Sequence, residues 1–130
     1  IGPIKTVPSA DGGTRTYVSV DGGLSDNPRP VMYDAPYPVL LANRAGEDAS
    51  MEVRIAGRHC ETDTLIPAAF LPEPKSGDLL AVQCTGAYNH TMASNYNFFY
   101  RPAVVFAKQG KAREVVRRET QEDLLARDLD

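Results

Sequence analysis

Glycine and proline interrupt this chain so often that no long regular element fits between them. Ten of each are spread over 130 residues, and β-branched and aromatic residues fill much of the short stretches that remain. Proline removes a backbone donor, whereas β-branched and aromatic side chains suit a pleated, half-buried surface. The pattern therefore favours an all-β domain of short strands over a helical one.

Chain length limits how this β-rich sequence can be organised. With 130 residues there is room for one domain with a modest core, and we expect residues 1–130 to form that domain. No methionine precedes Ile1, which leads us to expect a fragment or a processed product.

Charge and hydropathy argue against several classes of partner. The formal net charge is -3, with acidic and basic residues mixed along the chain, so no basic stripe indicates a nucleic-acid partner. No apolar run approaches the ~18 residues of a membrane-spanning helix, and we expect a cytoplasmic protein with no membrane partner. Cys60 and Cys84 suit neither a disulfide framework nor a structural zinc site, so we expect reduced thiols and no metal.

Apolar residues alternate or cluster in several short stretches bounded by glycine, proline or turn residues. The stretches expected to form strands are 17–21, 39–43, 51–56, 79–84, 104–108 and 113–117. The last two flank Gln109-Gly110-Lys111, which is typical of a hairpin turn. Short strands at this fairly even spacing indicate a barrel or a sandwich.

The remaining segments are expected to be irregular or weakly helical. Four prolines break residues 27–38, which we expect to form a structured loop with at most one helical turn. Residues 67–74 are expected to be irregular and residues 75–78 to form a turn. Thr120, with Asp123 three positions later, resembles a capping box and predicts a short C-terminal helix.

An arginine between two prolines is the first cluster that could carry chemistry. Arg29 follows Pro28 and precedes Pro30, so its backbone loses little entropy on ordering, and a guanidinium can bind a carboxylate through two hydrogen bonds. Tyr33 lies four residues on and would face the same way in a helical turn. Taken alone, a surface arginine beside a core tyrosine is the simpler interpretation.

The second cluster is His59-Cys60-Glu61-Thr62-Asp63, shortly after the glycine that ends an expected strand. A thiol beside a carboxylate on a loop could donate a proton and bind a ligand. A buried cysteine flanked by an exposed turn is the alternative. His59 and Cys60 alone are a weak case for a metal site.

The third and fourth clusters are Gly86-Ala87-Tyr88-Asn89-His90 and the stretch from Met92 to Asn97. Small residues before Tyr88 allow close approach of the backbone, and its phenol could reach a phosphate or a ring. An aromatic residue packed over the core at a strand end is the simpler interpretation.

Taken in order, these clusters resemble the C-terminal half of the fold-type III pyridoxal-phosphate decarboxylases, and most closely the diaminopimelate decarboxylases. The family patterns are Asp-Gly-Gly…Arg-Pro-x-x-Tyr, Cys-Glu-Ser-x-Asp and Gly-Ala-Tyr…Met-x-Ser-x-Tyr-Asn…Arg-Pro. The matching residues are Asp21-Gly22-Gly23 with Arg29-Pro30 and Tyr33, Cys60-Glu61-Thr62-Asp63, Gly86-Ala87-Tyr88, and Ser94-Asn95-Tyr96-Asn97 with Arg101-Pro102. Each motif is weak alone, but four in family order over residues 17–105 outweigh the simpler interpretations.

The resemblance implies a fold and an activity. The expected fold is an all-β, Greek-key-like β-barrel C-terminal domain with a short C-terminal helix. The intact enzyme would be a lyase of lysine biosynthesis that converts meso-2,6-diaminopimelate to L-lysine and carbon dioxide. In this family an N-terminal α/β barrel domain provides most of the binding site for pyridoxal 5'-phosphate, including the lysine that forms a Schiff base with it. That domain would be absent from this chain, because Lys5, Lys75, Lys108 and Lys111 lie in no matching motif. The chain alone is therefore expected to be inactive.

The resemblance also implies a role for each site residue. Arg29 and Tyr33 would bind the distal carboxylate of the substrate, and Glu61 would pair with its distal ammonium. Tyr88 would contact substrate and cofactor, and Cys60 would be the acid that returns a proton after carbon dioxide leaves. In this family the Cys-Glu loop reaches the active site of the other subunit, so a homodimer with shared sites is expected.

One departure from the family and several alternatives remain at this point. Cys-Glu-Thr-Asp is one residue shorter than the family motif, which predicts a tighter loop and a less secure alignment of Asp63. The alternatives are a decarboxylase of carboxynorspermidine, ornithine or arginine, and a non-catalytic, free-standing β-domain. Arg29 argues against ornithine and arginine, because those substrates have no distal carboxylate.

Overall fold

The computed structural model of the chain describes residues 1–61 and 64–129. The strands are β1 (Ile4–Pro8), β2 (Thr14–Ser19), β3 (Val39–Leu41), β4 (Met51–Ala56), β5 (Thr64–Leu71), β6 (Leu80–Val82), β7 (Val104–Lys108) and β8 (Lys111–Val116). The helices are α1 (Arg29–Tyr33), α2 (Asn89–Met92) and α3 (Gln121–Leu125), with 3-10 turns η1 (Ala42–Arg44) and η2 (Tyr96–Phe98). Within the described ranges no helix has the length and apolarity needed to cross a membrane.

The domain is dominated by sheets and has few helices, as expected, but the strands lie in open sheets, so the expected Greek-key-like β-barrel is wrong. Across residues 1–61 and 64–129 they form a four-stranded sheet in the order β1-β2-β4-β5 and two pairs, β3-β6 and β7-β8. Pro8 lies in β1 and Pro67 in β5, the two edge strands. Because proline has no N–H to give to a neighbouring strand, it confines its strand to an edge and hinders closure.

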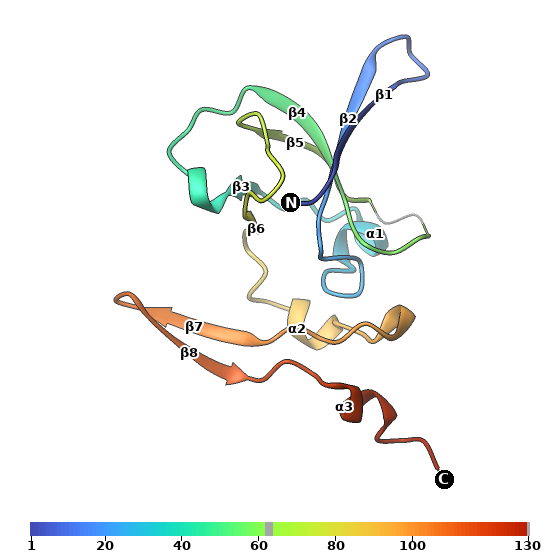
Figure 1. Cartoon of the computed structure of the whole chain (residues 1–130), viewed down its shortest axis with the longest axis vertical. Helices are drawn as coiled ribbons and strands as arrows, with labels where there is room; N and C mark the ends of the chain where they lie inside the picture. Colours follow the sequence, from blue (N-terminus) through green and yellow to red (C-terminus); the bar gives the residue numbers. More distant parts are fainter. Residues whose placement is uncertain (62–63, 130) are drawn as a thin grey trace.

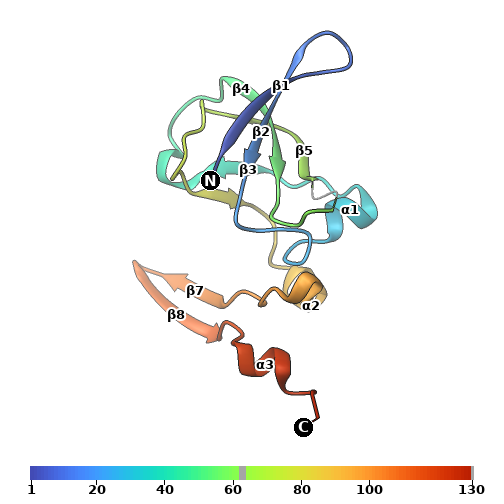
Figure 2. The ribbon, with the colours of Figure 1, turned by 45° about the vertical axis from the view of Figure 1, so that its right-hand side comes forward.

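Figures 1 and 2 show β1 to β6 gathered in one body, with β7, β8 and α3 forming an arm beneath it. β7 and β8 form the expected hairpin, but its turn has two residues, because Lys111 belongs to β8 and not to the turn. Gln109 (φ 51°) and Gly110 (φ 72°) both adopt the left-handed backbone of a type I′ turn. The expected terminal helix is also confirmed. Thr120 and Asp123 make both hydrogen bonds of a capping box at the start of α3.

Two strands were not expected from the sequence. One is β1, and the other is β5, which contains residues 67–71 of the segment 67–74 that was expected to be irregular and pairs antiparallel with β4. The register shifts so that Val53 faces Ala69 while Ile55 faces Ile66, and the intervening residues form an irregularity. A proline in a strand is tolerated at such an edge irregularity, and here Pro67 still accepts a hydrogen bond from Arg54 Nε through its carbonyl (3.1 Å).

The core lies where β2, β3, β4 and β5 meet. Val18, Leu41, Ile55 and Leu71 supply one side chain from each of these strands, and each is at most 1% exposed. Burying one such side chain stabilises the fold by roughly 1.5–3 kcal/mol. The alternation of apolar residues expected in residues 51–56 places Val53 and Ile55 of β4 on the buried face of the sheet.

The parallel pairing of β2 with β4 determines where the functional motifs meet. Val18 on β2 lies beside Ile55 on β4, so both strands end at the same edge of the sheet. The loop after β2 carries α1, and the loop after β4 carries the Cys-Glu motif. Arg58 joins the two loops, donating its backbone N–H to the Gly22 carbonyl (3.0 Å) and pairing with Asp26 (3.2 Å).

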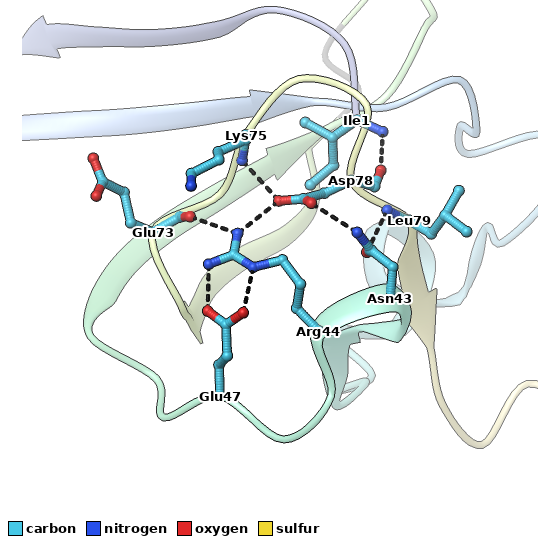
Figure 3. A network of polar contacts seen from close by, with 8 residues as sticks. All are labelled: Ile1, Asn43, Arg44, Glu47, Glu73, Lys75, Asp78 and Leu79. Atoms are coloured by element: carbon cyan, nitrogen blue, oxygen red, sulfur yellow. Dashed lines mark hydrogen bonds and ion pairs between the residues drawn. The ribbon is translucent and has the colours of Figure 1, made fainter.

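A buried carboxylate holds the opposite side of the body together (Figure 3). Asp78, 6% exposed, lies in the turn before β6 and accepts hydrogen bonds from Asn43 Nδ2 (2.9 Å), Arg44 Nη1 (2.9 Å) and the Lys75 backbone N–H (2.8 Å). Arg44 also pairs with Glu47. The Asn43 amide, then the Lys75 N–H and Arg44, lower the pKa of the Asp78 carboxyl. The network thereby ties η1 to the turn that was expected at residues 75–78.

Replacing Asp78 with alanine should lower the free energy of unfolding by about 2–4 kcal/mol, because it leaves Arg44 and Asn43 without their shared acceptor. The Asp78 pKa is lower in the folded than in the unfolded chain. Its stabilising effect is therefore complete above about pH 4 and declines as the pH falls through the lowered value. Urea unfolding of both proteins at a series of pH values measures this difference. A difference below about 0.5 kcal/mol at neutral pH would contradict the assignment.

Candidate functional site

The first part of the site is a single helical turn. Pro28 caps α1 and Pro30 lies within its first turn, so the prolines start the helix that they could not continue. Asp34, in the left-handed region (φ 50°), ends it. Arg29 and Tyr33 consequently share one face, with the guanidinium carbon of Arg29 5.6 Å from the centre of the Tyr33 ring. The expected helical turn and the expected pairing are both confirmed.

Tyr88 joins this pair from a segment nearly sixty residues further along the chain. The Arg29 guanidinium carbon lies 4.8 Å from the centre of the Tyr88 ring, which is a cation–π distance. Tyr88 precedes α2 with a positive φ of 72°. Asn89, buried beside it, accepts a hydrogen bond from the hydroxyl of Tyr37 (3.2 Å), which ties the start of α2 to the loop after α1.

Arg29 has no carboxylate partner within residues 1–61 and 64–129, and its two aromatic neighbours are more than half exposed. A guanidinium held over two rings and open to solvent presents its N–H groups to an incoming anion. The arrangement can therefore bind a carboxylate, with the Tyr33 and Tyr88 hydroxyls as further hydrogen-bonding groups.

The second part of the site is the Cys-Glu loop after β4. Cys60 and Glu61 are exposed, whereas His59 before them is only 5% exposed. Glu61 Oε2 accepts a hydrogen bond from Asn97 Nδ2 at 3.0 Å. The backbone N–H of Glu61 and then the Asn97 amide lower the pKa of the Glu61 carboxyl, which keeps it ionised at neutral pH. Asp63 of the same motif lies outside the described residues.

In the part of the chain that the structure describes, no hydrogen bond, ion pair or ring contact joins Cys60 or Glu61 to Arg29, Tyr33 or Tyr88. One chain thus presents an anion-binding group and, separately, an acidic group with a thiol beside it. No cluster of three or more metal-ligating side chains occurs among the described residues.

Several contacts that shape the site were not expected from the sequence. They are the buried pair His59 Nε2 with Ser25 Oγ (2.9 Å), the Asn97 amide on Glu61, and the Tyr37–Asn89 hydrogen bond. Each joins residues that are more than thirty positions apart in the chain. The one sequence signal was that a histidine, an asparagine and a serine lay inside or beside the four clusters.

Comparison with known proteins identifies the class to which these motifs belong. Residues 4–86 match the family described as pyridoxal-dependent decarboxylase, C-terminal sheet domain. The chain belongs to this family. Strands β1 to β6, α1 and Cys60-Glu61 all lie within the matched residues.

Relatives of this decarboxylase domain agree with the assignment. The diaminopimelate decarboxylases of Synechocystis sp. and Bacillus subtilis are 50% and 54% identical to it, over 98% and 99% of the chain. The crystal structure of diaminopimelate decarboxylase from M. jannaschii in complex with L-lysine superposes on the whole chain with a TM-score of 0.87 at 32% identity. The chain spans 27% and 29% of the length of the two sequence relatives and 29% of that structure.

Proposed function

We propose that this decarboxylase domain works as part of a cytoplasmic diaminopimelate decarboxylase, which converts meso-2,6-diaminopimelate to L-lysine and carbon dioxide. The observation that carries the proposal is the Arg29 guanidinium, held over Tyr33 and Tyr88 without a carboxylate partner among the described residues. Meso-2,6-diaminopimelate differs from lysine by a carboxylate, so an enzyme that selects it needs a cation of this kind. The names of the relatives point to the same substrate.

Each site residue then has a chemical role. Arg29 and Tyr33 bind the distal carboxylate, and the ionised Glu61 binds the distal ammonium. Tyr88 hydrogen-bonds to the substrate and to the edge of the cofactor. Cys60 Sγ holds the proton that passes to the α-carbon after carbon dioxide leaves.

The residues of the chain fit the periphery of a pyridoxal 5'-phosphate site. The exposed phenol of Tyr88 is a suitable donor to a phosphate. The four lysines lie in β1, in the turn before β6 and at the two ends of the β7–β8 turn, away from α1 and α2 in the chain. When bound, the cofactor's pyridine ring withdraws the electrons of the breaking carbon–carboxylate bond. We assign most of its binding to an N-terminal α/β barrel domain.

The separation of the two site parts supports a homodimer with shared sites. A single substrate must meet Arg29 and Glu61 at its distal end, yet within the described part of one chain no hydrogen bond or ion pair joins these two residues. Glu61 and Cys60 lie on an exposed loop at the edge of the sheet and are free to enter the site of a second subunit. In a twofold dimer both active sites would then be completed by the same exchange.

The full-length enzyme, supplied with pyridoxal 5'-phosphate, should release carbon dioxide from meso-2,6-diaminopimelate. Its specificity constant for this substrate should be at least about a hundredfold higher than for ornithine or arginine. Those substrates have no distal carboxylate, so their binding would desolvate the Arg29 guanidinium and leave it unpaired. The same assay with carboxynorspermidine separates the remaining alternative. The 130-residue chain alone, with folding checked by circular dichroism, should show no activity and retain no cofactor after dialysis. A preference for ornithine, arginine or carboxynorspermidine would contradict the proposal.

A further inference from the structure

The hydrogen bond between Asn97 and Glu61 depends on an unusual backbone conformation at Asn97. Asn97 lies in η2 with a left-handed backbone (φ 54°), and Phe98 after it is left-handed as well (φ 59°). Consecutive left-handed residues other than glycine are strained and persist only where their surroundings hold them. Asparagine tolerates this conformation better than most residues. The strain turns the Asn97 amide toward the Cys-Glu loop.

The Asn97 amide lies between two polar groups. Asn97 Nδ2 donates to Glu61 Oε2 (3.0 Å) and lies 3.4 Å from His59 Nδ1. The other ring nitrogen, His59 Nε2, lies at hydrogen-bond distance from Ser25 Oγ (2.9 Å). A chain of hydrogen bonds thus runs from the buried serine, 1% exposed, to the exposed carboxylate.

The histidine in this chain is fixed by its neighbours. The rings of Tyr96 and Phe99 meet the His59 ring edge-on, with centres 5.2 and 5.0 Å away. The guanidinium of Arg58 in turn lies over the Phe99 ring, 4.1 Å from its centre. His59 is therefore held in a set position beside the Asn97 amide, and the amide cannot turn its oxygen toward Glu61 without losing the hydrogen bond to that carboxylate.

We propose that Asn97, oriented by His59 and Ser25, is a positioning residue that holds the Glu61 carboxylate in the direction from which it meets the ammonium of the substrate. The inference rests on the proposed function, in which Glu61 binds that ammonium. A carboxylate has about four acceptor positions, so the bond from Asn97 can direct the Glu61 carboxylate, which the Glu61 backbone N–H and Tyr96 also influence, and still leave a position for a cation. Asn97 acts on substrate recognition through Glu61 and does not touch the reacting atoms.

The test uses the full-length enzyme with Asn97→Asp and Asn97→Gly. Both substituted residues tolerate the left-handed backbone, and neither donates an amide hydrogen to Glu61. Each variant should raise KM for meso-2,6-diaminopimelate about ten- to a hundredfold and change kcat by less than about threefold, since a charge-assisted hydrogen bond to the binding group is lost. Asn97→Asp adds repulsion of Glu61, so its KM should be the higher of the two.

A double-mutant cycle separates positioning from general structural damage. In a Glu61→Gln background, the new side-chain amide can donate to the carboxylate that Asn97→Asp introduces, so adding Asn97→Asp should raise KM by less than about twofold. The matched control is Asn43→Asp, because Asn43 also donates its amide to a carboxylate, that of Asp78 (2.9 Å), in the structural network of Figure 3. Asn43→Asp should lower the unfolding temperature and leave KM unchanged.

The outcomes distinguish this inference from the proposed function. Failure of the wild-type enzyme to decarboxylate meso-2,6-diaminopimelate would refute the proposed function itself. With an active wild type, three results would each overturn the role of Asn97: an unchanged KM in both Asn97 variants, an equal effect of Asn97→Asp with and without Glu61→Gln, or an unchanged KM in Glu61→Gln alone. The role of Asn97 is supported if Asn97→Asp raises KM in the wild-type background but does not raise it further in the Glu61→Gln background.

Discussion

Cys60→Ala in the full-length enzyme should be nearly inactive, and its activity should partly return when its subunits are exchanged with those of a second inactive variant. Loss of a positioned acid typically costs about a hundred- to ten-thousandfold in kcat. Cys60 is exposed beside Glu61 on the loop after β4, and among the described residues no hydrogen bond, ion pair or ring contact joins either of them to Arg29, Tyr33 or Tyr88. In the proposed dimer the thiol would serve the neighbouring subunit.

The second parent lacks the lysine of the α/β barrel that binds the cofactor. If Cys60 acts across the interface, each mixed dimer has one site with both defects and one site with neither. Random exchange makes about half of the dimers mixed, so activity should reach about a quarter of that of the wild type. If Cys60 acts on its own subunit, every site carries a defect and mixing restores nothing. No recovery after exchange has been verified by mass spectrometry would exclude the shared site.

Arg29→Leu should lower the specificity constant for meso-2,6-diaminopimelate about 30- to 4000-fold, with cofactor binding unchanged. This corresponds to a loss of about 2–5 kcal/mol of binding free energy in the transition state. The leucine preserves much of the aliphatic packing against Tyr33 and Tyr88 but removes the charge that the distal carboxylate meets. Steady-state kinetics and absorbance titration of the cofactor measure the two effects separately.

Arg54→Leu is the matched control for this variant. Arg54 also lies near a tyrosine ring, with its guanidinium carbon 5.9 Å from the centre of Tyr17, but on the face of the four-stranded sheet. Its specificity constant should stay within about twofold of the wild-type value. Equal losses in the two variants would show that removing any such arginine damages the enzyme, and Arg29 would lose its assigned role.

Local patterns in the sequence predicted the local parts of this structure. Arg29 and Tyr33 are four residues apart beside two prolines, so a single helical turn was enough to bring them to one face. The hairpin turn at Gln109-Gly110 and the capping box of Thr120 with Asp123 follow equally from neighbouring residues. Tyr88, by contrast, could be linked to Arg29 only through the resemblance to a family, because the two meet by tertiary packing.

The errors have the same physical origin. Prolines in residues 67–74 suggested irregular structure, yet Pro67 is acceptable in β5 because the strand lies at an edge, which the sequence does not reveal. The closed barrel required strand partners that periodicity cannot specify, and the parallel pairing of β2 with β4 was among those not foreseen. The chain of contacts from Ser25 through His59 and Asn97 to Glu61 depends on that pairing, since it brings the two loops to one edge.

The backbone of Tyr88 has a consequence for how this protein responds to selection. Its left-handed conformation costs a residue with a side chain on the order of 1–3 kcal/mol, a penalty that glycine would avoid. Glycine would also remove the ring that covers Arg29. Laboratory evolution for heat resistance alone would therefore favour the loss of this tyrosine, and evolution under a requirement for growth without added lysine would retain it.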